Sequence, residues 1–112
     1  SIDMTGFRGD TTLCYRRKKL YERTIEQELA ARTRVMGGIA PKFTSPGFAG
    51  MPDRLVLLPR GRMGFVEFKV PGRKPRPLQL ARHRLLRRLG FKVYVIDKID
   101  QIDSVLEEID HE

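Results

Sequence analysis

Two short runs decide the fold of this chain: MPDRLVLL at residues 51–58 and GFVEFKV at residues 64–70. Both are rich in the apolar and aromatic residues that favour strands, so we expect strands over residues 55–58 and 64–70. The segment between them, Pro59-Arg60-Gly61-Arg62, carries the proline and glycine typical of a tight turn. An antiparallel hairpin is therefore the simplest connection.

The second run breaks its own apolar pattern at two positions. Residues two apart in a strand point to the same face, so Glu67 and Lys69 project together while their apolar neighbours project to the other face. Glu and Lys are rarely buried in a sheet without a partner charge or a bound ion. Asp53 opens the preceding strand, and hairpin geometry brings its carboxylate within reach of Glu67. The sequence thus predicts two carboxylates and one ammonium in one place.

The rest of the chain predicts helices around this hairpin. Apolar periodicity and flanking Gly and Pro residues predict helices over residues 21–36, 78–89 and 102–109, and strands over residues 39–44 and 91–96. A helix that joins strand 64–70 to strand 91–96 makes a right-handed parallel crossover. The order helix, three strands, helix, strand, helix predicts an α/β fold in which helices cover a mixed central sheet.

The start of the chain is predicted to be separate from this domain. Residues 1–19 lack clear periodicity and end in the basic cluster Arg16, Arg17, Lys18 and Lys19. We interpret them as a poorly defined N-terminal arm that can touch phosphates, and residues 20–112 as a single domain. A chain of 112 residues has room for one modest core.

Charge points to a polyanionic partner. The formal net charge is +8, and residues 60–92 hold eleven Lys or Arg against one acidic residue, Glu67. Nucleic acid is the commonest partner of such a basic domain, although a solvated basic surface is the alternative. The side chains that we expect to contact DNA phosphates are Lys42, Arg73, Lys74, Arg76 and Arg82.

Composition excludes several other classes of protein. Cys14 is the single cysteine, so neither an internal disulfide nor a cysteine zinc site is predicted. His83 and His111 are isolated in the sequence and predict no zinc site either. No apolar run approaches the ~20 residues that span a bilayer, so we expect no membrane partner. The single cysteine fits a reducing compartment, so we expect a cytoplasmic protein.

The predicted cluster suits phosphodiester hydrolysis. The hard oxygens of Asp53 and Glu67 are ligands that Mg²⁺ or Mn²⁺ accepts, with waters and a phosphate oxygen completing the shell. Lys69 is placed to orient the nucleophile or to stabilise the transition state. Glu26 is the further carboxylate, direct or through water, and Gln79 is a hydrogen-bond donor to the phosphate or to a ligand. Each residue alone has an ordinary structural explanation; together, in a basic domain, they indicate a metal-dependent nuclease.

With these residues in view, the sequence resembles the VRR-Nuc family, a branch of the PD-(D/E)xK nuclease superfamily, from about Tyr21 to Leu106. The matching residues are Ile25-Glu26, Gly37-Gly38, Lys42-Phe43, Ser45-Pro46-Gly47, Gly50-Met51-Pro52-Asp53-Arg54, Phe65-Val66-Glu67-Phe68-Lys69-Val70-Pro71-Gly72, Pro77-Leu78-Gln79 and Leu89-Gly90-Phe91. The combination of Gly-x-Pro-Asp, Glu-x-Lys and Pro-x-Gln makes the resemblance specific.

The resemblance implies an αβββαβ core and a divalent-metal site formed by Asp53, Glu67 and the main-chain carbonyl of Phe68, with roles for Glu26, Lys69 and Gln79. Small stand-alone members resemble phage and bacterial homodimers that act on branched DNA, including four-way junctions. The resemblance therefore implies a homodimeric, structure-selective endodeoxyribonuclease of the Holliday junction resolvase type, in a bacterial or phage-infected cell. A basic DNA-binding module without catalysis and a flap-cutting or restriction-type nuclease stay open as alternatives.

Overall fold

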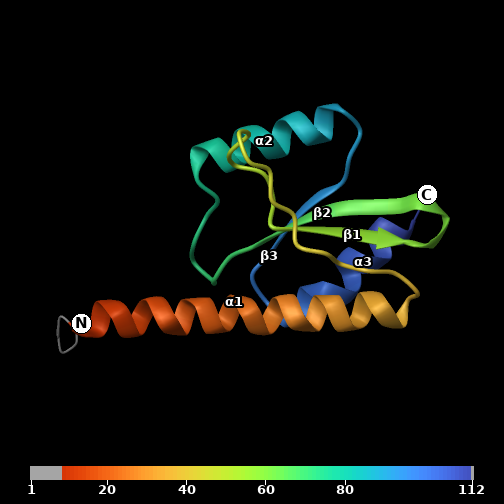
Figure 1. Ribbon diagram of the computed structural model, residues 1–112. Helices are drawn as coiled ribbons and strands as arrows, with labels where there is room; N and C mark the ends of the chain where they lie inside the picture. The colour runs from red at the N-terminus through yellow and green to blue at the C-terminus, as the bar shows by residue number, and fades with distance from the viewer. Residues whose placement is uncertain (1–8, 112) are drawn as a thin grey trace.

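A computed structural model describes residues 9–111 of the chain. Its elements follow the order helix, hairpin, helix, strand, helix (Figure 1). They are α1 (Gly9–Val35), β1 (Arg54–Leu58), η1 (Pro59–Gly61), β2 (Arg62–Phe68), α2 (Pro77–Arg88), β3 (Val93–Ile96), η2 (Ile99–Gln101) and α3 (Ile102–Asp110).

The sheet is mixed, with the strand order β1-β2-β3. β1 pairs with β2 antiparallel, with Arg54 opposite Val66, and β2 pairs with β3 parallel, with Phe65 opposite Val93. The predicted hairpin and the predicted parallel crossover are both confirmed. Helix α2 covers one face of the sheet, and α1 and α3 cover the other (Figure 1). The α/β fold with a mixed central sheet is therefore confirmed.

The core is divided unequally between the two faces. The larger apolar cluster lies between the sheet and helices α1 and α3, and it includes Val66 and Phe68 of β2. The smaller cluster lies under α2 and has three buried residues, Phe65, Leu86 and Val93. Because side chains alternate along a strand, Glu67 shares the α2 face with Phe65. A charged residue thus occupies the less apolar side of the sheet.

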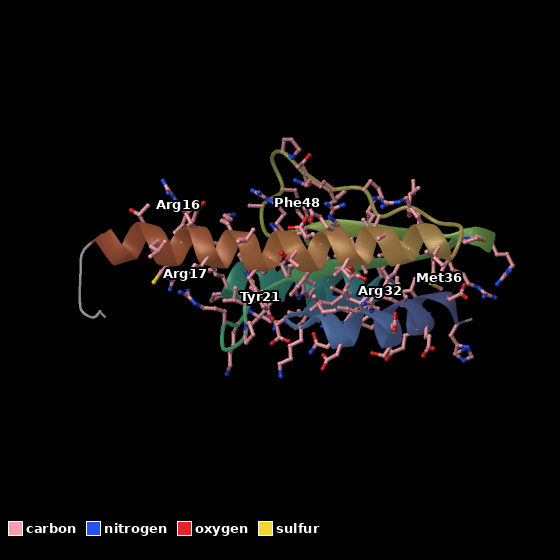
Figure 2. The ribbon with its side chains drawn as sticks, turned by 90° about the horizontal axis from the view of Figure 1, so that it is seen from below. Arg16, Arg17, Tyr21, Arg32, Met36 and Phe48 are labelled. Carbon is pink, nitrogen blue, oxygen red and sulfur yellow. The ribbon has the colours of Figure 1, made fainter. Side chains whose placement is uncertain are left out.

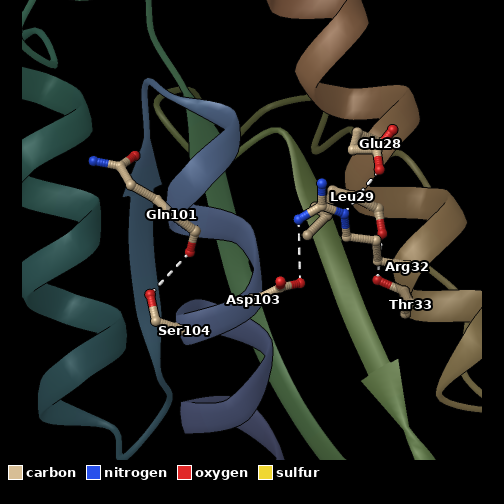
Figure 3. A network of polar contacts seen from close by, with 7 residues as sticks. All are labelled: Glu28, Leu29, Arg32, Thr33, Gln101, Asp103 and Ser104. Atoms are coloured by element: carbon tan, nitrogen blue, oxygen red, sulfur yellow. Dashed lines mark hydrogen bonds and ion pairs between the residues drawn. The ribbon is translucent and has the colours of Figure 1, made fainter.

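Helix α3 is tied to α1 by polar contacts as well as by the core. Arg32 of α1 donates to Glu28 Oε2 at 2.8 Å and to Asp103 Oδ1 of α3 at 3.1 Å (Figure 3). On the next residue of α1, Thr33 Oγ1 donates to the Leu29 carbonyl at 2.7 Å.

Among the described helices, none combines the length and apolar character that crossing a membrane requires.

The strand predicted over residues 39–44 is reduced to two isolated bridges. Ile39 pairs with Leu57 and Lys42 pairs with Arg54, so this segment runs antiparallel along β1. Pro41 lies between the two bridges and has no N–H to donate, which interrupts the ladder. The three-strand run implied by the αβββαβ pattern is therefore present as two strands and one bridged edge segment.

Helix α1 begins far earlier than predicted. It starts at Gly9, so residues 9–19, expected to be part of a poorly defined arm, continue the helix predicted from residue 21. Residues 1–8 of that expected arm lie outside the described chain. This half of α1 extends past the sheet and the other helices, with Arg16 and Arg17 on it (Figure 2). Within it, the run Arg16, Arg17, Lys18 and Lys19 consists of good helix formers, while the apolar periodicity starts only where α1 reaches the core at Ile25 and Leu29.

Candidate active site

Glu67 is the most deeply buried charged residue of the β2 hairpin strand, at 1% exposure. Its Oε2 accepts a hydrogen bond from Gln79 Nε2 at 2.7 Å and lies 3.4 Å from Lys69 Nζ. Its Oε1 is buried and has no hydrogen-bond partner within the described part of the chain. One carboxylate oxygen is thus held firmly, and the other is left for a ligand that the protein does not supply.

Burial makes the negative charge of Glu67 energetically unfavourable. Burial raises the pKa of Glu67 to about 7, and the nearby Asp53 carboxylate adds to the rise while Lys69 opposes it. A buried carboxylate with a pKa near neutrality and a second carboxylate beside it is stabilised by any added cation.

Asp53 directly precedes β1, the strand that pairs antiparallel with β2. Extending the β1–β2 register by one residue from the Arg54–Val66 pair sets Asp53 opposite Glu67. Asp53 Oδ2 accepts a hydrogen bond from the main-chain N–H of Phe68 at 2.9 Å. Partial burial raises the pKa of the Asp53 carboxyl, that hydrogen bond lowers it, and the Glu26 charge raises it. The residue as a whole is exposed to solvent.

Lys69 and Gln79 approach Glu67 from the two ends of the β2–α2 connection. The Lys69 N–H donates to the Ile96 carbonyl at 3.0 Å, which keeps Lys69 in line with β2 and on the face of Glu67. Gln79 is buried, and its Oε1 accepts from the Arg76 N–H at 2.8 Å, which caps the start of α2. The same side chain therefore caps α2 and orients Glu67.

Glu26 lies near the cluster but faces another partner. Its Oε1 accepts a hydrogen bond from Arg54 Nε at 2.9 Å, and Arg54 also donates to the Ala40 carbonyl. The Glu26 charge is close enough to raise the pKa of Asp53. The ion pair between Glu26 and Arg54 connects α1 to β1, and the bond from Arg54 to Ala40 connects β1 to the bridged edge segment. Ligation of a metal by Glu26 stays a prediction.

His83 is a member of the cluster that the sequence interpretation set aside. It is 1% exposed, and its Nε2 lies 3.9 Å from Glu67 Oε1 without a hydrogen-bond partner in the described residues. Burial lowers the pKa of His83, and the charges of Arg87 and Lys69 lower it further, so the ring is neutral at pH 7. Its spacing from Gln79 was available in the sequence, because residues four apart share one face of a helix.

These groups fit a hard divalent cation. No three His, Cys, Asp or Glu side chains in residues 9–111 are grouped to bind an ion by themselves. Mg²⁺ does not need such a cage, because it binds one or two carboxylates and keeps several waters. Asp53 and Glu67 are two neighbouring carboxylates, and Oε1 of Glu67 has no hydrogen-bond partner among the described residues. The main chain of Phe68 also lies close by, since its N–H donates to Asp53.

The predicted DNA-contacting residues divide into separate groups. Arg73, Lys74 and Arg76 line a cavity of about 300 Å³ that also contains Lys69. Lys42 lines a different cavity of about 450 Å³, with Glu26 and Arg54. Arg82 belongs to neither lining: its guanidinium stacks on the Phe48 ring at 3.8 Å, and its Nε donates to the Ala49 carbonyl at 2.8 Å. The first three therefore share a cavity with Lys69, whereas Lys42 shares one with Glu26.

Known proteins resemble the chain over most of its length, although no family model matches the sequence. A protein of Acyrthosiphon pisum secondary endosymbiont phage 1, named "Putative nuclease p44", is 50% identical over 88 residues, which are 79% of this chain and 94% of that protein. A solved structure described as a VRR_NUC domain has 36% sequence identity and a TM-score of 0.73, and the match covers 78% of this chain and 95% of that one.

The chain belongs to the VRR-Nuc family. The family resemblance drawn from the sequence is thereby confirmed, as is the α/β nuclease core. In this VRR-Nuc chain, Asp53, Glu67, Lys69 and Gln79 converge at the C-terminal end of the central strand β2, near the start of α2.

Proposed function

We propose that this VRR-Nuc chain is a divalent-metal-dependent endodeoxyribonuclease whose metal site is formed by Asp53 and Glu67. The observation that carries the proposal is the buried, unpartnered Oε1 of Glu67 beside a second carboxylate. Lys69 and Gln79 contact only Oε2 of Glu67, and a buried carboxylate oxygen without a partner is unfavourable, so we infer that a cation binds Oε1 during function. Mg²⁺ or Mn²⁺ matches the oxygen ligands, and the main-chain carbonyl of Phe68 and a water held by Glu26 are the further ligands that we propose.

The neighbouring side chains divide the remaining tasks. Gln79 holds Oε2 of Glu67 at 2.7 Å, which fixes the carboxylate with Oε1 directed away from this bond. The Lys69 ammonium, 3.4 Å from the same Oε2, stabilises negative charge that grows on the scissile phosphate and orients the attacking water. The bound cation supplies Lewis-acid polarisation of the phosphate and a water of lowered pKa.

We propose branched DNA, and four-way junctions in particular, as the substrate of a homodimer. The similar protein comes from a phage and is named as a nuclease, and this chain spans 94% of its length. A two-fold dimer presents two equivalent sites to a symmetric junction, so paired cuts follow from the protein symmetry. With DNA as substrate and Cys14 free and exposed, we propose the reducing cytoplasm of a bacterial or phage-infected cell as its compartment.

The test is cleavage of labelled four-way, flap, blunt duplex and single-stranded DNA with Mg²⁺, Mn²⁺ or EDTA. We expect four-way junctions to be cut best and EDTA to abolish cutting. Glu67→Ala and Lys69→Ala are each expected to lower the cleavage rate by at least ~100-fold while junction binding in EDTA survives. Arg84→Ala is the matched control, since Arg84 is an exposed cation on α2 outside the cluster.

The outcomes separate the competing functions. Undiminished cleavage by both cluster variants would eliminate this active site. Binding of every DNA without cleavage by any metal would favour a basic DNA-binding module. Preferred cutting of flaps, or of particular duplex sequences, would favour the flap or restriction-type alternative. Sedimentation equilibrium decides whether the chain is a dimer.

A further inference from the structure

We propose that the N-terminal half of α1 and the loop of residues 71–76 form a site for an unpaired nucleotide of the DNA strand, with Tyr15 stacking on its base. The inference rests on the proposed nuclease function and deepens it, because it specifies single-stranded DNA beside the cluster as part of the substrate. It also gives a task to the segment of α1 that the sequence alone left as an arm.

One face of α1 leads from this segment to the carboxylate cluster. Tyr15, Lys19, Glu22 and Glu26 are spaced four, three and four residues apart and therefore share one helix face. Lys19 and Glu22 line one cavity together with Lys69, and they line a second cavity together with Glu26 and Arg54. This face of α1 therefore runs from Tyr15 past the ammonium group of the cluster.

The loop between β2 and α2 lies against this part of α1. In Figure 1 it leaves the end of β2, descends toward the N-terminal half of α1 and then rises to α2. Helix and loop enclose the cavity of about 300 Å³ that contains Lys69. That volume is at the lower end of the ~300–1,000 Å³ of small-molecule pockets, so it accommodates a nucleotide and not a duplex.

The lining has the chemistry of a single-strand site. It combines one aromatic ring with cations from both walls, and these residues are Tyr15, Lys18, Lys19, Arg73, Lys74 and Arg76. Tyr15 is 59% exposed, and Lys19 Nζ lies 5.6 Å from its ring centroid. Stacking on an exposed ring together with Lys and Arg contacts to phosphates is how proteins hold unpaired DNA. Glu22, the carboxylate of the lining, disfavours phosphate beside it and directs the backbone toward the loop.

Continuity with Lys69 connects this cavity to the proposed chemistry. The Lys69 ammonium belongs to the lining and lies 3.4 Å from Glu67 Oε2. A strand that passes from the cavity to the carboxylates therefore crosses Lys69. Branched DNA supplies such a strand where its base pairing is interrupted, whereas blunt duplex DNA does not.

The experiment measures fluorescence anisotropy of labelled oligothymidylate and of a blunt duplex with the full chain in EDTA, where no cleavage occurs. Tyr15→Leu is expected to weaken oligothymidylate binding by about fivefold or more, because stacking on a base is lost. Tyr15→Phe keeps the ring and is expected to bind as the wild type does. Duplex binding is expected to be the same in all three proteins. Circular dichroism checks that α1 is retained.

A charge variant tests the phosphate contacts separately. Lys18→Gln is expected to lower the salt slope of log K for oligothymidylate by about 0.7, the value for one phosphate contact on a single strand. Arg16→Gln removes the same charge from the same helix, and Arg16 is exposed and outside the cavity lining, so its slope is expected to stay at the wild-type value.

Several results would overturn the inference. They are a wild-type protein that does not bind oligothymidylate, a Tyr15→Leu variant with unchanged affinity, and equal effects of the variant on duplex and single strand. Each of these leaves the nuclease proposal standing, since metal-dependent cleavage is measured separately. Conversely, absent cleavage with a Tyr15-dependent affinity for oligothymidylate supports the single-strand site and refutes the nuclease proposal alone.

Discussion

Replacing Glu67 with glutamine is expected to stabilise the metal-free protein at pH 8 while it removes the proposed activity. Glutamine has the shape of the protonated carboxyl group, and its amide oxygen still accepts the hydrogen bond that Gln79 Nε2 gives to Oε2 at 2.7 Å. What the substitution removes is a negative charge that is 1% exposed and lies beside Asp53. A residue retained for ion binding is expected to lower stability in just this way.

The size of the effect follows from the pKa. Burial, then the Asp53 charge, raises the pKa of Glu67 from its ordinary value of 4.5 to about 7 in the folded protein. The folded state therefore holds the proton more tightly, and this contribution to stability is fully present below pH 4.5 and is lost as pH rises through 7. At 1.36 kcal/mol per pH unit the loss is about 3 kcal/mol. The glutamine variant has no such loss of stability, so its melting temperature at pH 8 is expected to be roughly 10 °C above that of the wild type.

Urea denaturation in EDTA at pH 5 and at pH 8 measures this difference. We expect the variant to exceed the wild type in free energy of unfolding at pH 8 and to approach it at pH 5. Mg²⁺ is expected to raise the stability of the wild type alone, since only the wild type keeps both carboxylates. Glu107→Gln, on the exposed side of α3, is the matched control and is expected to change stability by under ~0.5 kcal/mol. A Glu67→Gln protein that is no more stable than the wild type at pH 8 would refute the reasoning.

Three further predictions concern the frame around the cluster. Arg54→Met is expected to lower the free energy of unfolding by about 2 kcal/mol, because it leaves the Glu26 carboxylate without the donor now at 2.9 Å; adding Glu26→Gln should recover part of this loss in urea denaturation, and an additive double variant would contradict the pairing. Gly38→Ala is expected to cost about 2 kcal/mol or more in thermal denaturation, since its Cβ would lie 2.2 Å from the Leu57 carbonyl oxygen; an unchanged melting temperature would show that the edge segment yields. In an NMR titration His83 is expected to protonate below its ordinary pKa of 6.5, since burial and the nearby cations lower its pKa, and a midpoint above 6.5 would refute the lowered pKa.

The hairpin was predictable because its causes are local in sequence. Alternating apolar residues set the two strands, and the Pro59–Gly61 turn joins them. From that register alone Asp53 lies opposite Glu67, and the two-residue period adds Lys69 on the same face. The handedness of the crossover then places the start of α2 over the end of β2, which brings Gln79 to the cluster.

What could not be predicted depends on contacts distant in sequence. The N-terminal half of α1 has no core to pack against, so the apolar period that marks a buried helix is absent there although the helix forms. The partner of Glu26 is 28 residues away in the chain, and no periodicity connects them. His83 has no other zinc ligand near it in the sequence, so the sequence predicts no role for it. In the fold its Nε2 lies 3.9 Å from Oε1 of Glu67.

The unequal packing of the two sheet faces follows from the same cluster. Between β2 and α2, three buried positions that apolar side chains would otherwise fill hold Glu67, Gln79 and His83. Apolar residues there would strengthen the small cluster of Phe65, Leu86 and Val93, since each buried aliphatic side chain contributes about 1.5–3 kcal/mol. Gln79 offsets part of the loss by capping α2, but two buried polar atoms, Glu67 Oε1 and His83 Nε2, gain no partner from the described protein. The chain is therefore less stable than it could be at the end of β2, beside the cationic cavity. A site for a metal and a DNA strand requires polar atoms there that have no partner within the protein.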